Sequence, residues 1–295
     1  MDTKYLALAS LGKNQWWRYL LGLVLIIVFW QLLGAIPLGM LVILVMGDDD
    51  PSTDVDLNTL QFTGVDSLLP YLGINFTLLS MLLGVFLAVR FLHQRHFTSL
   101  LTPFSRINWL RILEGFTAFF LLITLATVLE ALFKPQAYQI TFDLKQFLIF
   151  LPIALVVTPL QAAAEELLFR GYLMQGLGLW SRRALFPVLG SSLLFMAAHL
   201  TNPEVGEDMY LIPLLYLLMG LFLAFITVKS NSLELAIGAH AANNLFAVLI
   251  MNYAGSALPA PSIFMADSID PVASLLSFVL VASAFYWVVF VWRKV

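Results

Sequence analysis

Residues 162–170 read AAAEELLFR, and this short polar stretch lies inside a long apolar segment, residues 147–179. An ionisable side chain in the hydrocarbon of a bilayer costs about 2.5–3.5 kcal/mol on insertion scales, so chains keep one mainly where it is paired or used. Glu166 and Arg170 are four positions apart with the acid first, which places them on one helix face where they can pair. Glu165 lies about 100° away around the helix, so that pair leaves it free.

Composition places the whole chain in a membrane. Of its 295 residues, 61% are hydrophobic and 11% are charged, and the mean hydropathy is +0.91, outside the range of soluble domains. We expect an all-α polytopic membrane protein that forms one domain, residues 1–295. A net charge of -3, without a phosphate loop or basic tail, gives no indication of nucleic-acid binding. The lack of cysteine excludes disulfides and cysteine-based metal sites.

Apolar segments predict a bundle of about eight transmembrane helices, each at or near the roughly 20 residues that a spanning helix needs. The predicted spans are Tyr19–Met46, Leu68–Leu92, Trp109–Phe133, Phe147–Leu179, Ala184–Leu200, Tyr210–Val228, Leu233–Tyr253 and Val272–Trp292. Gly34 and Pro37 predict a bend in the first span, and Pro152 and Pro159 predict kinks in the fourth. The first span is longer than the core of a secretory signal, so we expect it to remain as an anchor.

The charges of the loops predict the orientation of the bundle. An even number of spans puts both termini on one side, and all Lys and Arg residues except Lys134 and Lys145 fall on that side. The loops on the other side are acidic and include Glu204. Because Lys and Arg concentrate in cytoplasmic loops, we expect cytoplasmic termini, in a bacterial plasma (inner) membrane. His93 and His96 lie in a basic connection and are interpreted as solvated.

The other two histidines fall inside predicted spans. Glu165 and His199 each lie 17 positions from Arg182, near the tip of a predicted helical hairpin. Their side chains are therefore expected to lie level, about 25 Å from the tip. His240 and Asn244 share one face of the seventh predicted helix, one turn apart.

Three predicted helices can thus present Glu165, His199, His240 and Asn244 to one cavity, which we expect to open towards the cytoplasm. A carboxylate beside an imidazole, facing a second imidazole and an amide, is typical of a hydrolytic site. These four groups supply a base, a partner for that base and donors for an oxyanion.

The order of these motifs resembles a known family. EExxxR, FxxxH and HxxxN follow one another on successive apolar segments, like the signature of the CPBP (Abi) intramembrane endopeptidases. That family includes the type II CaaX prenyl endopeptidases and bacterial proteins linked to bacteriocin processing and self-immunity. The resemblance covers residues 147–253, the expected catalytic core. The matching residues are Glu165, Glu166 and Arg170, then Phe195 and His199, then His240 and Asn244.

The resemblance implies an all-helical membrane endopeptidase in which Glu165 and His199 activate a water molecule for attack on a peptide carbonyl. It assigns His240 and Asn244 to stabilisation of the oxyanion. The residues that it implies as support for the site are Glu166, Arg170 and Phe195. The implied partners are the lipid bilayer and a membrane-associated peptide or protein, such as a leader-bearing bacteriocin-like precursor or a lipid-modified tail.

Three alternatives stay open at the level of sequence. Glu165, His199 and His240 would make a three-ligand zinc site with an open position for water, although HExxH is absent. Family members are described both as metalloproteases and as metal-independent glutamate enzymes, and we favour the second. A non-catalytic immunity or scaffold protein is another alternative. A proton-coupled transporter would use the same three residues as a relay, but the sequence lacks the internal symmetry typical of carriers.

Overall fold

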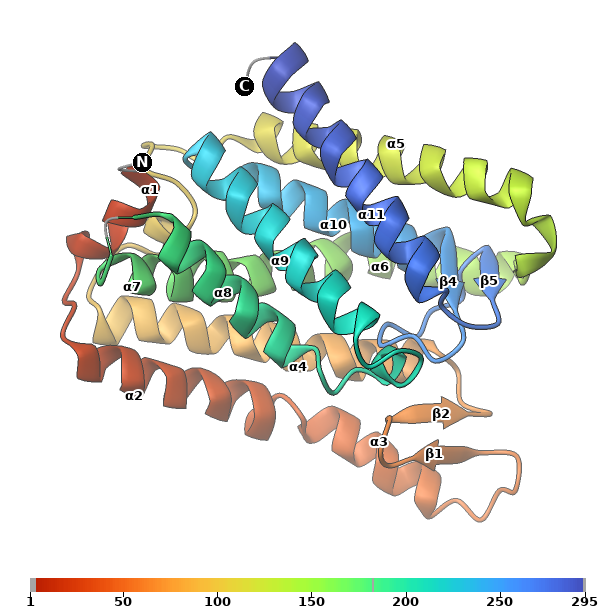
Figure 1. Ribbon diagram of the computed structural model, residues 1–295. Helices are drawn as coiled ribbons and strands as arrows, with labels where there is room; N and C mark the ends of the chain where they lie inside the picture. The colour runs from red at the N-terminus through yellow and green to blue at the C-terminus, as the bar shows by residue number, and fades with distance from the viewer. Residues whose placement is uncertain (1–3, 182, 294–295) are drawn as a thin grey trace.

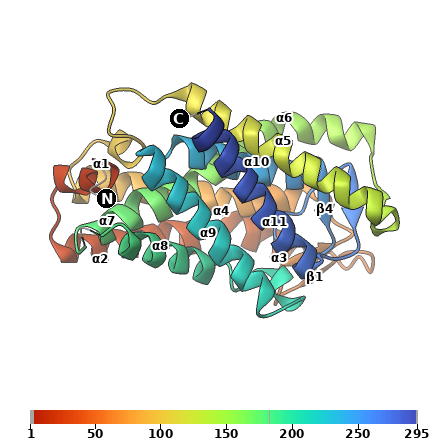
Figure 2. The same cartoon turned by 45° about the horizontal axis from the view of Figure 1, so that its top comes forward.

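The computed structural model describes residues 4–181 and 183–293. It is mostly helical, and the long helices lie beside one another in a bundle (Figure 1). Helix α1 (Lys4–Ala7) and the C-terminal end of the described chain lie towards one end of this bundle, here called the terminus end (Figure 1). Short strands gather at the opposite end, here called the strand end, in both views (Figures 1 and 2).

The long helices are separated by short helical segments, several of which extend a long helix. The α-helices are α1 (Lys4–Ala7), α2 (Trp16–Ile27), α3 (Ile36–Met46), α4 (Leu68–Leu87), α5 (Trp109–Phe133), α6 (Leu144–Glu166), α7 (Met174–Gly178), α8 (Leu185–Ala198), α9 (Leu211–Ser230), α10 (Glu234–Leu249) and α11 (Pro271–Tyr286). The π-helical segments are η2 (Val28–Leu33), η3 (Ala88–Leu92), η6 (Leu167–Leu173) and η8 (Trp287–Trp292). The 3-10 segments are η1 (Leu8–Leu11), η4 (Phe97–Leu100), η5 (Pro135–Ala137) and η7 (Pro203–Gly206).

Within the described residues, six helical segments are long and apolar enough to cross a membrane. They are Trp16–Met46, Leu68–Leu92, Trp109–Phe133, Leu144–Gly178, Leu211–Ser230 and Pro271–Trp292. Each matches one predicted span. The other two predicted spans contain α8, with 14 residues, and α10, with 16, which are shorter than a usual spanning helix. The polytopic membrane class is therefore supported, whereas the count of eight and the orientation stay predictions.

The first segment breaks where the sequence predicts. Gly34 separates η2 from α3, and the chain changes direction there (Figure 1). A Cβ added at Gly34 would lie 2.8 Å from the Cα of Thr77, so glycine permits the close approach of α4. Pro37 lies in the first turn of α3, where a missing N–H is tolerated. Pro152 and Pro159 both lie inside α6, which continues through them.

Within residues 4–181 and 183–293, five strands of three residues each lie at the strand end, and the all-α prediction does not include them. β1 (Asp54–Asp56) pairs antiparallel with β2 (Gln61–Thr63). β5 (Phe264–Ala266) pairs antiparallel with β3 (Tyr138–Ile140) and parallel with β4 (Met251–Tyr253). These strands join connections for which the sequence predicts loops.

Helix α10 forms the centre of the bundle. Fourteen of its sixteen residues are buried. Small residues let it approach its neighbours closely, since a Cβ added at Gly238 would lie 2.1 Å from the carbonyl oxygen of Ile112 on α5. His240 follows two positions later and is therefore placed in the interior.

The terminus end contains a buried polar cluster that the sequence analysis misread. His93 is 1% exposed rather than solvated. Its Nδ1 lies 2.9 Å from the carbonyl oxygen of Lys13, and its Nε2 lies 2.9 Å from the hydroxyl of Tyr172. The prediction for His96 is confirmed, because that side chain is exposed. We call this the terminus cluster and define it as Tyr5, His93, Arg95, Tyr172 and Gln175.

Candidate active site

Glu165 lies where the winding of its helix changes. α6 ends at Glu166, and η6 continues it as a π-helix. Single π-helical turns are frequent at functional sites. The Glu165 side chain is buried, and its Oε1 accepts a hydrogen bond from Nε2 of Gln161, one turn earlier. Its Oε2 has no hydrogen-bond partner among the described residues.

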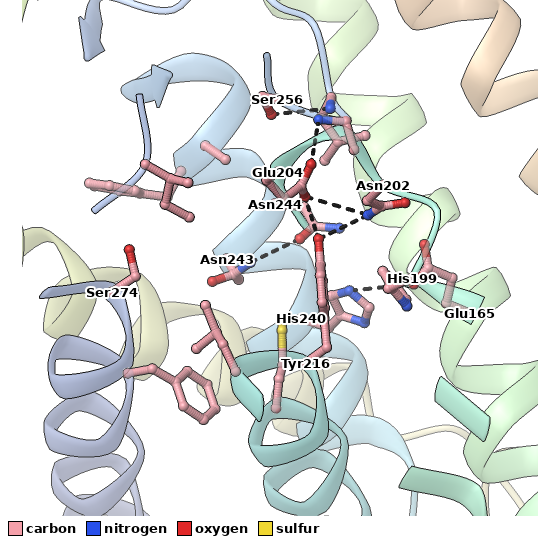
Figure 3. A pocket seen from close by; sticks show the side chains of 18 of the residues that line it. Glu165, His199, Asn202, Glu204, Tyr216, His240, Asn243, Asn244, Ser256 and Ser274 are labelled. Atoms are coloured by element: carbon pink, nitrogen blue, oxygen red, sulfur yellow. Dashed lines mark hydrogen bonds and ion pairs between the residues drawn. The ribbon is translucent and has the colours of Figure 1, made fainter. Parts of the chain in front are cut away.

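His199 follows the last residue of α8 and faces Glu165. Its Nε2 lies 3.7 Å from Oε2 of Glu165, so the predicted level placement of the two side chains is confirmed (Figure 3). Nδ1 of His199 lies 2.7 Å from the carbonyl oxygen of Phe195. A carbonyl oxygen only accepts, so Nδ1 carries hydrogen and Nε2 of the neutral ring is an acceptor. The ring lies between those of Phe195 and Tyr216, with centroids 4.3 and 4.4 Å away.

His240 reaches the same carboxylate from α10. Its Nε2 lies 3.9 Å from Oε2 of Glu165, and its Nδ1 lies 2.8 Å from Oε1 of Glu166. The same Oε1 accepts a hydrogen bond of 2.8 Å from Nη1 of Arg170, which confirms the predicted pair. A carboxylate paired with arginine is an acceptor, so Nδ1 of His240 donates and Nε2 of the neutral ring accepts.

Three acceptor atoms therefore converge in one place without a donor. They are Oε2 of Glu165 and the Nε2 atoms of His199 and His240. A buried acceptor without a partner costs about 1–3 kcal/mol. Such a set suits a small molecule with two O–H donors, and water is the simplest. The arrangement can bind and polarise a water molecule.

Arg170 and Phe195 hold the two histidines of the site in position. Arg170 is fully buried, and its guanidinium lies 4.3 Å from the centroid of the Phe195 ring, at a distance typical of a cation–π interaction. It holds Glu166, which in turn holds His240. Phe195 supplies the carbonyl oxygen that orients His199. These contacts fix both imidazoles, in agreement with a supporting role.

Asn244 reaches Glu165 through a residue that the sequence analysis missed. Its Nδ2 donates to Oε1 of Gln161 over 2.9 Å, which orients the Gln161 amide so that Nε2 donates to Glu165. Asn243 donates in turn to Oδ1 of Asn244 over 3.0 Å. The signal for Gln161 was available, because a polar residue one turn before Glu165 shares its helix face.

A second polar cluster borders the site at the strand end (Figure 3). Glu204, which the sequence places in an acidic loop, is 5% exposed. Its Oε1 accepts from the hydroxyl of Tyr216 and from Nδ2 of Asn202, and its Oε2 accepts from the backbone N–H of Ala257 over 3.2 Å. These bonds hold the Tyr216 ring against His199. Sequence spacing gave no signal for Glu204, because its partners come from three separate segments.

The site residues line a cavity of about 430 Å³. Its lining includes a buried apolar wall formed by Met81, Phe119, Phe169, Phe195 and Val281. Other lining residues are at the strand end: Glu130, Asn202, Glu204, Tyr253, Ser256, Ala257, Ile269 and Ser274. The described connections at the terminus end, residues 93–108, 179–181, 183–184 and 231–233, contribute none. The cavity thus extends away from the termini, whereas the sequence predicts an opening on the side of the termini.

The zinc alternative finds no support in the geometry. Glu165, His199 and His240 do come together, but no group of three or more His, Asp or Glu side chains among the described residues is arranged so that it could hold a metal ion. The carboxylate oxygen lies 3.7 and 3.9 Å from the two imidazole nitrogens. The zinc alternative therefore stays a prediction.

Comparison with known proteins covers the segment that contains the site. The family model described as "Type II CAAX prenyl endopeptidase Rce1-like" matches residues 145–246, the segment that contains all three motifs. A relative from Bacillus subtilis (strain 168), "Uncharacterized protein YyaK", is 32% identical over 263 residues, which cover 88% of this chain and 87% of the relative. The chain belongs to the CPBP family. No solved structure matches it at a significant level. Membership of the CPBP family implies a protease, in accord with the apolar helices of an integral membrane protein.

Proposed function

We propose that this CPBP protein is an intramembrane endopeptidase in which Glu165 and His199 activate a water molecule. The observation that supports this function is the convergence of three acceptor atoms without a donor. Such a set costs free energy in a folded protein unless a proton donor occupies it during function. A bound water donates one O–H to Oε2 of Glu165 and the other to Nε2 of His199, and its oxygen attacks the peptide carbonyl.

The proton balance follows from the same contacts. Glu165 accepts a proton from the attacking water and delivers it to the leaving amine when the tetrahedral intermediate collapses. His199 accepts the second hydrogen bond of the water and is held in that role by the Phe195 carbonyl.

In this proposal His240 and Asn244 act on the oxyanion, each under a condition. Nε2 of a neutral His240 accepts, so His240 donates to an oxyanion only as an imidazolium. Its Nδ1 contact with Glu166 fixes the ring so that Nε2 faces Glu165. Asn244 uses one Nδ2 hydrogen for Gln161 and retains the other.

The substrate class follows from the setting of the site. A partly apolar cavity within a helix bundle suits a peptide or protein held at the bilayer, such as a leader-bearing precursor or a lipid-modified tail. We propose the bacterial plasma membrane as the location, because a similar protein occurs in Bacillus subtilis.

The test is peptide cleavage by detergent-purified protein. Glu165→Gln keeps the shape of the side chain but removes the base, so turnover should fall by about 10²–10⁴-fold, the usual contribution of a general base. Glu207→Gln is a matched control, since Glu207 is an exposed carboxylate beside η7. A correctly inserted Glu165→Gln protein that cleaves at the wild-type rate would falsify the proposal.

Repeating the cleavage assay with a chelator distinguishes a metal-independent enzyme from a zinc-dependent one. Activity that persists with a chelator but is lost in Glu165→Gln supports the water-activating carboxylate. Activity that is lost with the chelator and restored by zinc would instead require a metal-activated water.

A further inference from the structure

The cavity is displaced towards one end of the bundle. Glu130, in the last turn of α5, and Ser274, in the first turn of α11, both line it. The connection from α8 to α9 contributes Asn202, and the connection from α10 to α11 contributes Ala257. Each of these positions belongs to the strand end, so the cavity approaches the surface there.

The other end is closed behind the site. Tyr5 is 0% exposed, and its hydroxyl lies 2.6 Å from the carbonyl oxygen of Leu100 and 3.2 Å from that of Arg170. Tyr172 is also 0% exposed and is bonded to His93. The N-terminal segment therefore packs against the backbone of the residue that supports the site. A substrate arriving from the terminus end would have to displace these side chains.

The two ends also differ in charge. Among the described residues, Lys134 and Lys145 are the only Lys or Arg side chains in or beside the connections of the strand end. These connections instead carry acids, including Asp208 and Asp267. Because Lys and Arg concentrate on the cytoplasmic side of a membrane protein, the terminus end is assigned to the cytoplasm and the strand end to the opposite face.

Together these observations lead us to propose that the site receives its substrate from the extracytoplasmic face of the membrane. The substrate is then a membrane-anchored peptide whose scissile bond lies on that face. The identity of the substrate rests on the endopeptidase function proposed above, whereas the direction of access rests on the cavity and the charges alone.

The natural chain has no cysteine, so single-cysteine variants give an unambiguous test. Ala257→Cys and Ser274→Cys place a thiol on the cavity lining outside the catalytic group. Ser52→Cys marks the exposed surface of the strand end, and Ser105→Cys marks the exposed surface of the terminus end. Each variant is treated with a charged, membrane-impermeant maleimide, in intact cells and in permeabilised cells. Labelling after denaturation confirms that the thiol is present.

We expect the two cavity variants and Ser52→Cys to be labelled in intact cells, and permeabilisation to add little. Labelling of Ser105→Cys should rise several-fold on permeabilisation. Labelling of Ser105→Cys but not Ser52→Cys in intact cells would overturn the proposal by reversing the topology. Cavity thiols that stay unlabelled in intact cells in which Ser52→Cys reacts would overturn it too, because the cavity would then not be reached from that face.

The same labelling in a Glu165→Gln background separates this inference from the proposed function. Accessibility does not depend on turnover, so the pattern should be unchanged. A chain that cleaves nothing but shows the expected pattern refutes the protease and leaves the direction of access standing. A chain that cleaves peptides but shows the reversed labelling pattern refutes the direction of access and leaves the protease standing.

Discussion

Two polar clusters lie within the same bundle, one around Glu165 and one around His93. Each contains a buried histidine, a tyrosine and an arginine in contact or nearby. In the terminus cluster both ring nitrogens of His93 have partners, and Gln175 donates to the carbonyl oxygen of Ser99 over 2.9 Å. In the site cluster Oε2 of Glu165 has no hydrogen-bond partner, and the Nε2 atoms of His199 and His240 face it.

The difference between the clusters shows what marks a site in a membrane protein. Buried polar side chains alone do not, because the terminus cluster uses them to fasten the N-terminal segment to the bundle. Converging acceptors without a donor are different, since the fold gains nothing from placing them together. We therefore expect substitution of the unpartnered acceptors of the site to change turnover, and substitution of buried, partnered groups such as those of the terminus cluster to change stability.

The largest expected effect is on turnover, from His199→Ala. Loss of the nitrogen that accepts a hydrogen bond from the attacking water should lower kcat by about 10²–10⁴-fold. The melting temperature in detergent should change little, since His199 is half-buried at a helix end. The exposed His96→Ala serves as control. A folded His199→Ala protein with the wild-type kcat would break the comparison.

Glu166→Gln should have the largest effect on stability. Arg170 and Glu166 are both 0% exposed and form an ion pair, and removal of one partner leaves a buried charge uncompensated. The expected loss is about 3–5 kcal/mol in the free energy of unfolding. Denaturant titration in detergent measures it. The double variant Glu166→Gln with Arg170→Met should recover part of the loss; no recovery would mean that the ion pair is not the cause.

His93→Phe tests the terminus cluster. Two hydrogen bonds disappear and the Tyr172 hydroxyl is left without a partner, so stability should fall by about 1–3 kcal/mol while kcat per folded molecule stays unchanged. A fall in kcat of the folded protein would show that the cluster also serves the site.

The difference in stability between the wild type and His93→Phe should depend on pH. Burial lowers the pKa of His93 below its ordinary value, so the folded protein favours the neutral ring. The stability that His93 contributes is then present above the unfolded pKa of about 6.5 and is lost as the pH falls below it. Melting curves across this range should show that loss in the wild type and less of it in His93→Phe.

The smallest expected effect comes from Gln161→Leu. Glu165 keeps its position in α6 but loses the donor to Oε1, and kcat should fall about tenfold, equivalent to about 1.4 kcal/mol. Gln146→Leu is the matched control, because Gln146 is exposed on the same helix. An equal fall in both variants would remove Gln161 from the site.

Several features of this protein follow from the sequence because their physics is local. The free energy cost of desolvation makes long apolar segments membrane helices, and six of the predicted spans correspond to helices of sufficient length. Helical spacing alone pairs Glu166 with Arg170. Equal spacing from a hairpin tip brings Glu165 level with His199.

Other features were decided only by the tertiary structure, because the partners are distant in the chain. The bond between His240 and Glu166, which sets the tautomer of the ring, joins residues 74 positions apart. Asn244 and Gln161 are 83 positions apart, and the contact that buries Glu204 against Ala257 spans 53. The end of the bundle towards which the cavity extends depends on which connections cover each end. A sequence specifies such contacts only through packing of the whole bundle, so neither the burial of His93 nor the set of residues that lines the cavity could be read from spacing.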